Sequence, residues 1–372
     1  MKMTLQVGRI AGIPVGLNYS WFAIFALVTF TLGQHVFPAL YPDWSTAVNW
    51  AVGVATSILF FLCLLAHELA HSVVALRKGV PVKSITLFIF GAAARIAREP
   101  PGPGAEFLMA AAGPLSSVLL AGLFALVWVA TRSSILPLAA IGYYLAWINL
   151  AVAAFNMLPG FPLDGGRVLR SIVWRRSGNY RKATRICSLI GQGLGYLLIA
   201  GGIALGALYY WVSGIWLVFI GAFLAIAASA SYRQAMLRES IKGVTAASLM
   251  AGDCQTVPGE LTVQTLVEGH TSPRDRRCLL VGEPGSITGV VTDIDIRRVP
   301  KRRRSTTRVS EAMTPVGRIA AVQPGDDGST VAERMTESVA GVLLVVSDGT
   351  VLGVIERERL VELGRSLVAR GA

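Results

Sequence analysis

The chain has 372 residues, of which 53% are hydrophobic and only 15% are charged, with a mean hydropathy of +0.58 and a net charge of +12. Soluble globular domains carry about 25% charged residues, so this composition excludes a wholly soluble protein. The apolar excess lies before about residue 232, and the remainder has the composition of a soluble domain. The sequence therefore predicts a multi-pass α-helical membrane domain over 1–232 and a soluble C-terminal part.

Six apolar segments follow one another in the membrane domain, each near the roughly 20 residues that a bilayer demands. They cover 17–33, 47–77, 106–131, 138–158, 187–208 and 211–231. Loops on one side hold almost no Lys or Arg, whereas the alternate loops are basic. Under the positive-inside rule, we expect both termini and the soluble part in the cytoplasm. The net charge then reflects membrane topology, and no nucleic-acid partner is expected. The N-terminus lacks the order of a signal peptide, so the first span is expected to remain in the mature protein.

The second span carries a short polar insert, His67-Glu68-Leu69-Ala70-His71. An ionisable group at the centre of a membrane helix costs ~2.5–3.5 kcal/mol on insertion scales, so packing does not explain three of them. Residues four apart lie one above the other on a helix face, which lets His67 and His71 bind one metal ion. The HExxH pattern thus predicts a Zn²⁺ site with Glu68 as general base. The alternative is polar packing of the two histidines against other helices.

Residues 82–99, between the second and third spans, are rich in β-branched and aromatic residues and are broken at Gly91. This pattern predicts a β-hairpin or a pair of strands at the cytoplasmic membrane face. A re-entrant or interfacial segment is the alternative. The sequence PPGPG at 100–104 then interrupts the chain before the third span.

A catalytic zinc site usually has three protein ligands and one open position, so a third ligand must come from elsewhere. Asp164 is the candidate, because it follows the fourth span at the same cytoplasmic depth as the HExxH motif, and Pro and Gly residues at 159–162 let the chain turn toward the second span. An Asp-Gly turn at a helix start is the alternative for Asp164. Asn156 either donates a hydrogen bond to a substrate carbonyl or makes an interhelical hydrogen bond. Cys63, one turn before His67, is either a competing ligand or a small buried hydrophobe.

The four cysteines, Cys63, Cys187, Cys254 and Cys278, are scattered and form no CxxC pair. Their spacing argues against a disulfide scaffold and fits a reducing compartment for the soluble part.

An internal repeat with a period of about 65 residues begins after residue 243. Each copy has a short start ending in Met, a turn, a helix, an apolar strand, a Gly-containing turn, a second strand and a helix. We predict an α/β tandem with one domain at 243–300, a second at 309–366 and a basic linker at 301–308. The linker is expected to be solvated, with contact to anionic lipid as the alternative.

With these motifs on view, residues 1–230 resemble the site-2 protease family, the intramembrane zinc metalloproteases. The resemblance rests on the HExxH motif, on 156–165, on Ala112-Gly113-Pro114 and on the strand-like segment around Phe90-Gly91. It implies that His67, His71 and Asp164 bind Zn²⁺, that Glu68 is the general base, and that Asn156 helps to hold the substrate backbone. It also implies that the substrates are transmembrane helices, cut within or near the bilayer.

The chain departs from this family at two places. Members often have Gly-Gly where this chain has Gly91-Ala92, and often have Asn soon after the third-span Gly-Pro, where this chain has Ser116 and Ser117. Neither departure is expected to touch the metal ligands, so both bear on substrate preference.

The two repeats resemble paired CBS domains, which often bind adenosine nucleotides and commonly dimerise. Thr292 and Asp295 match the Thr-x-x-Asp pattern that commonly contacts ribose and phosphate, whereas the second copy has Glu356 and Arg359 at these places. The resemblance implies a nucleotide cleft in the first copy and a homodimer. A purely structural or dimerising module is the alternative.

The expected function is therefore an intramembrane zinc endopeptidase that acts in regulated intramembrane proteolysis and is modulated by a nucleotide. A CBS-gated metal transporter and a proteolytically inactive membrane scaffold are the competing hypotheses. A transporter needs Glu68 only as a charge, whereas a hydrolase needs it as a base, so Glu68→Gln separates them.

Overall fold

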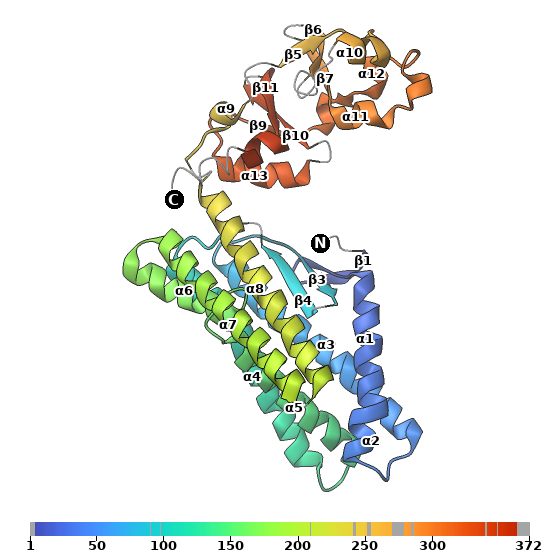
Figure 1. Cartoon of the computed structure of the whole chain (residues 1–372), viewed down its shortest axis with the longest axis vertical. Coiled ribbons are helices and arrows are strands. Elements are labelled where there is room, and N and C mark those ends of the chain that lie inside the picture. Colours follow the sequence, from blue (N-terminus) through green and yellow to red (C-terminus); the bar gives the residue numbers. More distant parts are fainter. Residues whose placement is uncertain are drawn as a thin grey trace. The chain divides into compact units, whose positions relative to one another are not determined.

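The computed structural model describes residues 4–89, 91–96, 98–208, 210–240, 243–250, 254–269, 279–283, 286–338, 341–347 and 349–362. Phe90 and Cys278, which the sequence analysis singled out, lie outside these ranges. The chain divides into two compact units, Met1–Tyr232 and Arg233–Ala372, and each is described by itself (Figure 1).

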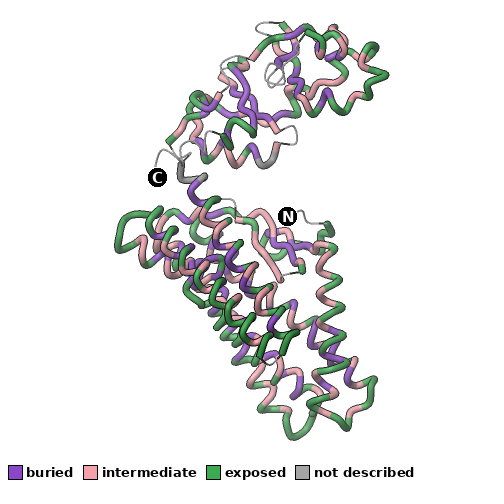
Figure 2. The backbone as a smooth tube through the Cα atoms, viewed as in Figure 1, coloured by how far each residue is buried: buried purple, intermediate pink, exposed green. Residues whose placement is uncertain are grey.

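Six long apolar helical segments make up most of the first unit, as the sequence predicts (Figure 1). They are α1 (Tyr19–Thr31) with η1 (Leu32–Val36) and α2 (Phe37–Leu40), then α3 (Thr46–Arg77), α4 (Pro103–Thr131), α5 (Leu136–Asn156), α7 (Tyr180–Leu208) and α8 (Trp211–Ser240). Each is long and apolar enough to cross a membrane. Exposed residues run along their outer sides (Figure 2), among them Leu126 and Ile226, which suits contact with lipid rather than water.

Helix α3 carries the HExxH motif and is the longest of the six. Its first turn is capped by Ser45, whose side chain accepts a hydrogen bond from the Val48 N–H. With 32 residues it is about 48 Å long, which exceeds the ~30 Å hydrocarbon thickness and requires tilt or a protruding end. It ends at Arg77 with Lys78 as its C-cap, and Gly79 beyond the cap has a φ of +74°.

A four-stranded sheet lies against α1 and α3. Its order is β1 (Leu5–Ile10), β2 (Ile13–Leu17), β3 (Val82–Phe88) and β4 (Gly91–Ile96). The predicted hairpin over 82–99 is confirmed, with β3 and β4 antiparallel. The N-terminal hairpin β1–β2 was not predicted; it turns at Ala11 and Gly12, which both have positive φ, and β2 runs parallel to β3. The apolar face packs on Phe61 and leaves β4 as an edge strand.

A separate amphipathic helix, α6 (Asp164–Ser177), follows the fourth span. Asp164 is the first residue of this helix, and residues 157–163 join it to α5. The helices on either side of α6 differ from the predicted spans. Helix α5 ends at Asn156 rather than at residue 158, and α7 begins at Tyr180 rather than near residue 187. The polar first turns of α7 had no hydropathy signal, although they continue the same helix.

The second unit contains both copies of the repeat, and each has the predicted helix followed by two strands. The first copy has α9 (Ala246–Leu249), β5 (Gln255–Val257), α10 (Val263–Gly269), β6 (Leu279–Glu283), β7 (Ser286–Val291) and α11 (Asp293–Arg298). The second has α12 (Val309–Ala312), β8 (Thr314–Pro315), η3 (Val316–Arg318), β9 (Ala321–Val322), α13 (Gly328–Glu337), β10 (Val342–Ser347) and β11 (Thr350–Glu356), and η2 (Lys301–Arg303) lies between the copies. The short strands β5, β8 and β9 before the predicted helices were not predicted.

The two copies form two sheets, β5-β6-β7-β8 and β11-β10-β9, so the first strand of the second copy completes the sheet of the first. Buried residues follow these strands (Figure 2). The basic linker is tied to the first copy, because the Val263 N–H donates to the Thr307 carbonyl oxygen and the Gln264 N–H to that of Arg304.

Two of the described cysteines, Cys63 and Cys187, are free and buried. Cys254 is disulfide-bonded, which the predicted absence of a disulfide scaffold did not foresee. The spacing of cysteines along the chain does not reveal which of them the fold brings together.

Candidate metal centre

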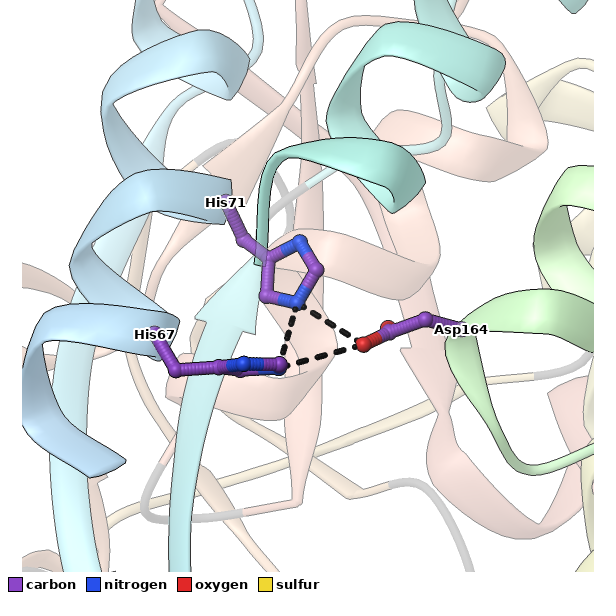
Figure 3. Close-up of side chains that lie close together, drawn as sticks. All are labelled: His67, His71 and Asp164. Atoms are coloured by element: carbon purple, nitrogen blue, oxygen red, sulfur yellow. Dashed lines mark hydrogen bonds and ion pairs between the residues drawn. The ribbon is translucent and has the colours of Figure 1, made fainter. Parts of the chain in front are cut away.

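Three side chains from two distant parts of the chain converge at one point (Figure 3). His67 and His71 come from the same face of α3, and Asp164 comes from the start of α6. The two Nε2 atoms are 3.2 Å apart, and Asp164 Oδ2 is 3.2 Å from His67 Nε2 and 3.1 Å from His71 Nε2. Both histidines are only 5% exposed, and Asp164 is half-buried.

Helix α4 orients both imidazole rings. His71 Nδ1 lies 2.6 Å from the Met109 carbonyl oxygen, and since a carbonyl oxygen only accepts, the proton is on Nδ1. His67 Nδ1 lies 2.9 Å from Ser117 Oγ. Anchoring of Nδ1 leaves Nε2 of each ring directed at Asp164, which is how the outer hydrogen bonds of a metal site fix ring orientation and tautomer.

Ser117 corrects one expectation from the sequence. Its departure from the family pattern was expected to leave the metal ligands untouched, but its hydroxyl contacts His67 directly. The sequence offered a signal, because Ser117, Gly113 and Met109 follow the spacing of one helix face, yet nothing in it showed that this face meets the motif.

The three donors fit a zinc ion. Zinc–nitrogen and zinc–oxygen distances of ~2.0–2.2 Å in a tetrahedral site place neighbouring donors ~3.3–3.5 Å apart, close to the sides of this triangle. Gly113 leaves the space beside the two Nε2 atoms free of side chain, because a Cβ built there would lie 2.6 Å from His67 Nε2 and closer still to His71 Nε2. Among the described residues, these three form the one group of three or more His, Cys, Asp and Glu side chains with this proximity.

The charge on Asp164 also suits a ligand. Burial by itself would raise the pKa of its carboxyl group, but hydrogen bonds with His67 and His71 outweigh burial and hold that pKa well below its usual range. The group is therefore an ionised carboxylate at neutral pH, the form that binds a metal ion.

Glycines bring Asp164 to this place. A Cβ on Gly165 would lie 2.5 Å from the Leu158 carbonyl oxygen, and one on Gly166 would lie 2.6 Å from the Phe161 N atom. Only the absence of side chains lets the start of α6 fold back on the 157–161 segment. The Asp-Gly-Gly sequence thus allows both the turn and the approach of the carboxylate.

Glu68 lies beside the triangle and contacts the edge strand. Its Oε2 accepts a hydrogen bond of 3.1 Å from the Ala94 N–H of β4. Because that N–H points to Glu68, it does not point to β3. In an antiparallel pair alternate residues present their N–H and C=O groups to the same side, so Ala92 also faces the open edge of β4.

The remaining predicted site residues lie elsewhere. Asn156 is the last residue of α5 and is half-buried, and Met157 after it packs against Gly165. Cys63 is buried on α3 and is not part of the donor group within the described ranges. In the second unit Thr292 and Asp295 are buried and form a capping box at the start of α11, with Thr292 Oγ1 2.7 Å from Asp295 Oδ2.

Comparison with known proteins identifies two families. The model of peptidase family M50 matches residues 55–137 and 131–198, and that of the CBS domain matches 309–365. "Putative zinc metalloprotease sll0528" of Synechocystis sp. is 36% identical over 97% of this chain and 96% of its own length. "Putative zinc metalloprotease Rip3" of Mycobacterium tuberculosis is 33% identical over 95% of this chain and 91% of its own. The solved site-2 protease from Methanocaldococcus jannaschii is 25% identical and covers 61% of this chain and 94% of that chain, with a TM-score of 0.42.

Proposed function

Because the chain belongs to peptidase family M50, the zinc metalloproteases of the site-2 protease type, we propose that it is an intramembrane endopeptidase that cleaves transmembrane-helix substrates in regulated intramembrane proteolysis. The observation that carries the proposal is the convergence of His67, His71 and Asp164 on one point beside Glu68. Six apolar helices make the chain a multi-pass membrane protein, and one of them, α3, carries His67 and His71.

Each residue has a role in peptide hydrolysis. His67, His71 and Asp164 would hold Zn²⁺, which when bound supplies Lewis acidity toward the peptide carbonyl and makes water more acidic. Glu68 accepts a proton from a water molecule while the oxygen of that water bonds to the carbonyl carbon of the peptide. Glu68 then passes that proton to the amide nitrogen as the C–N bond breaks. Asn156 donates a hydrogen bond to the substrate backbone.

The substrate is held as an added strand. A transmembrane helix hides its carbonyl groups in internal hydrogen bonds, so a segment must unwind before it is cut. The open edge of β4 presents backbone groups of Ala92 and Ala94 next to Glu68. A substrate strand that pairs there would place its backbone beside the general base.

Proline substitution tests this pairing. Ala92→Pro removes one N–H from the open edge and leaves the β3–β4 ladder bonds in place, since edge strands tolerate proline on their outer side. Cleavage of a transmembrane substrate should be lost, whereas Ala92→Ser, which keeps the N–H, should retain it. Equal cleavage by the two variants contradicts strand addition.

The metal content of the detergent-purified full chain tests the site itself. We expect about one zinc per chain in the wild type and a sharp loss in Asp164→Ala, because two imidazoles alone leave an incomplete ligand set. Zinc retained in Asp164→Ala would make Asp164 a turn residue only. Glu68→Gln should keep zinc and lose cleavage; cleavage that persists would remove its role as base and favour the transporter hypothesis.

The second unit is proposed as a cytoplasmic regulatory module that senses an adenosine nucleotide and pairs in a homodimer. The positive-inside rule supports the cytoplasmic placement of both termini. Asp295 Oδ1 is 3.5 Å from Thr314 Oγ1 of the second copy, so the cleft residues of one copy contact the other. Titration of the full chain with ATP, ADP and AMP tests the nucleotide, with Asp295→Asn expected to weaken binding; unchanged affinity would remove Asp295 from the cleft. Light scattering tests the dimer.

A further inference from the structure

A buried ion pair outside the metal centre joins the helix that bears Asp164 to the helix that orients the histidines. Arg170 of α6 is 8% exposed and Glu106 of α4 is 0% exposed. Arg170 Nε donates to Glu106 Oε1 at 2.7 Å, and the Arg170 Nη2 group also donates to that oxygen. Burying two charges is costly, so the arrangement calls for a reason beyond filling space.

Arg170 contacts two further elements. Its Nη1 donates to the Tyr180 hydroxyl of α7 at 2.8 Å, and its guanidinium carbon lies 4.8 Å from the Tyr180 ring centroid. The same carbon lies 5.0 Å from the ring centroid of Phe161, three residues before Asp164. The planar fork of arginine thus holds α4, α7 and the segment that leads into α6, a geometry that a lysine ammonium does not reproduce.

Glu106 stands on the face of α4 that builds the metal centre. Gly113 is seven residues and Ser117 eleven residues after it, and these spacings return to the same side of a helix. On that face the Ser117 hydroxyl contacts His67, and Gly113, which has no side chain, leaves room for the two imidazole rings. Anchoring Arg170 to Glu106 therefore fixes α6 relative to the surface that orients both histidines.

We propose that Arg170 is a positioning residue: through its ion pair with Glu106 it holds Asp164 at metal-binding distance from His67 and His71. The inference rests on the proposed function, since it requires that these three residues bind zinc. Arg170 is not one of the three donors, so its effect is on where the carboxylate lies.

The test separates positioning from stability. The zinc affinity of the detergent-purified full chain is measured by competition with a chelator, and the thermal midpoint is measured on the zinc-free form. Arg170→Met should bind zinc about 10-fold to 100-fold more weakly, the loss typical of outer supports of metal sites. The double variant Glu106→Leu with Arg170→Met replaces the ion pair by apolar groups of similar volume, which often restores stability. It should recover the midpoint but keep the weak zinc affinity, because apolar groups lack directional bonds.

Val52→Ala is the matched control, because Val52 is a buried residue of α3 in a cluster with Leu32 and Phe37 rather than with the site. It should lower the midpoint and leave zinc affinity unchanged. Wild-type zinc affinity in the double variant would overturn the proposal, and this variant carries the test if Arg170→Met does not fold. If the wild type does not bind zinc, the proposed function is overturned as well. If the wild type binds zinc and Asp164→Ala does not, the proposed function stands and only the role of Arg170 is in question.

Discussion

Gly113→Ala is the sharpest perturbation of the metal centre that the structure offers. The added Cβ would lie 2.6 Å from His67 Nε2 and 2.5 Å from His71 Cε1, whereas unstrained contacts between such atoms are ~3.5 Å or longer. The rings would have to withdraw by ~1 Å. Hydrogen bonds from Nδ1 to Ser117 and Met109 oppose that movement.

The expected cost follows from this overlap. Overpacking of this kind typically costs ~1–3 kcal/mol. At ~1.4 kcal/mol for each tenfold change, zinc affinity should fall roughly 5-fold to 150-fold. Cleavage should fall at least as far, because a misplacement of ~1 Å can cost about 100-fold in rate.

Chelator competition on the purified full chain measures the effect, and Gly122→Ala is the matched control. Gly122 lies on the same helix, and nothing lies within 4 Å of a Cβ built there. That variant should bind zinc as the wild type does and be slightly more stable, since alanine is a better helix former than glycine. Equal zinc affinity in the two variants would refute the argument that Gly113 reserves the space for the ion.

Three further predictions concern other parts of the chain. Ser117→Ala should weaken zinc binding about 10-fold, because it releases the His67 ring. The Ser116 hydroxyl donates to the Gly113 carbonyl oxygen instead, so Ser116→Ala is the control that should keep wild-type zinc binding. Equal losses of zinc binding in the two variants would contradict a specific role for Ser117. Gly191→Ala should lower the thermal midpoint strongly, because its Cβ would lie 2.8 Å from the Phe161 N atom, whereas Gly193→Ala, in open space, should not. Asp327 caps α13. Hydrogen bonds to its carboxyl group, chiefly from the Ser329 side chain, lower the pKa of that group. The folded form therefore binds protons less readily than the unfolded form. Its contribution to stability is complete above the unfolded pKa of ~3.9 and is lost as the pH falls below it. Asp327→Asn keeps the cap and should flatten this dependence of the unfolding midpoint of the second unit; an unchanged dependence would contradict the assignment.

Local patterns in the sequence determined the parts of this protein that depend on near neighbours. Hydropathy over about 20 residues located the six spans, since crossing a bilayer is a requirement on each helix separately. The spacing of His67 and His71 placed both on one helix face, because helical periodicity is fixed by the backbone. The strands β3 and β4, and the helix followed by two strands in each repeat, were predicted from local composition and turn residues.

Tertiary structure decided which of these faces meet. Asp164 was only a candidate ligand from its depth and neighbours, and the packing of Gly165 and Gly166 against residues 157–161 is what brings it to the histidines. The N-terminal hairpin was missed because β2 is stabilised by pairing with β3, some 70 residues away, rather than by a strong pattern of its own. The disulfide bond at Cys254 was likewise invisible in cysteine spacing.

The supports of the site belong wholly to the tertiary level. Ser117, Gly113 and Glu106 share one face of α4, but the sequence does not state that this face lies against α3 and α6. Helical periodicity tells which residues lie side by side on one helix. The buried ion pair and the contacts with the histidines join residues that are 50 to 97 positions apart in the chain. Such contacts depend on how the helices pack against one another, which the packed structure alone shows.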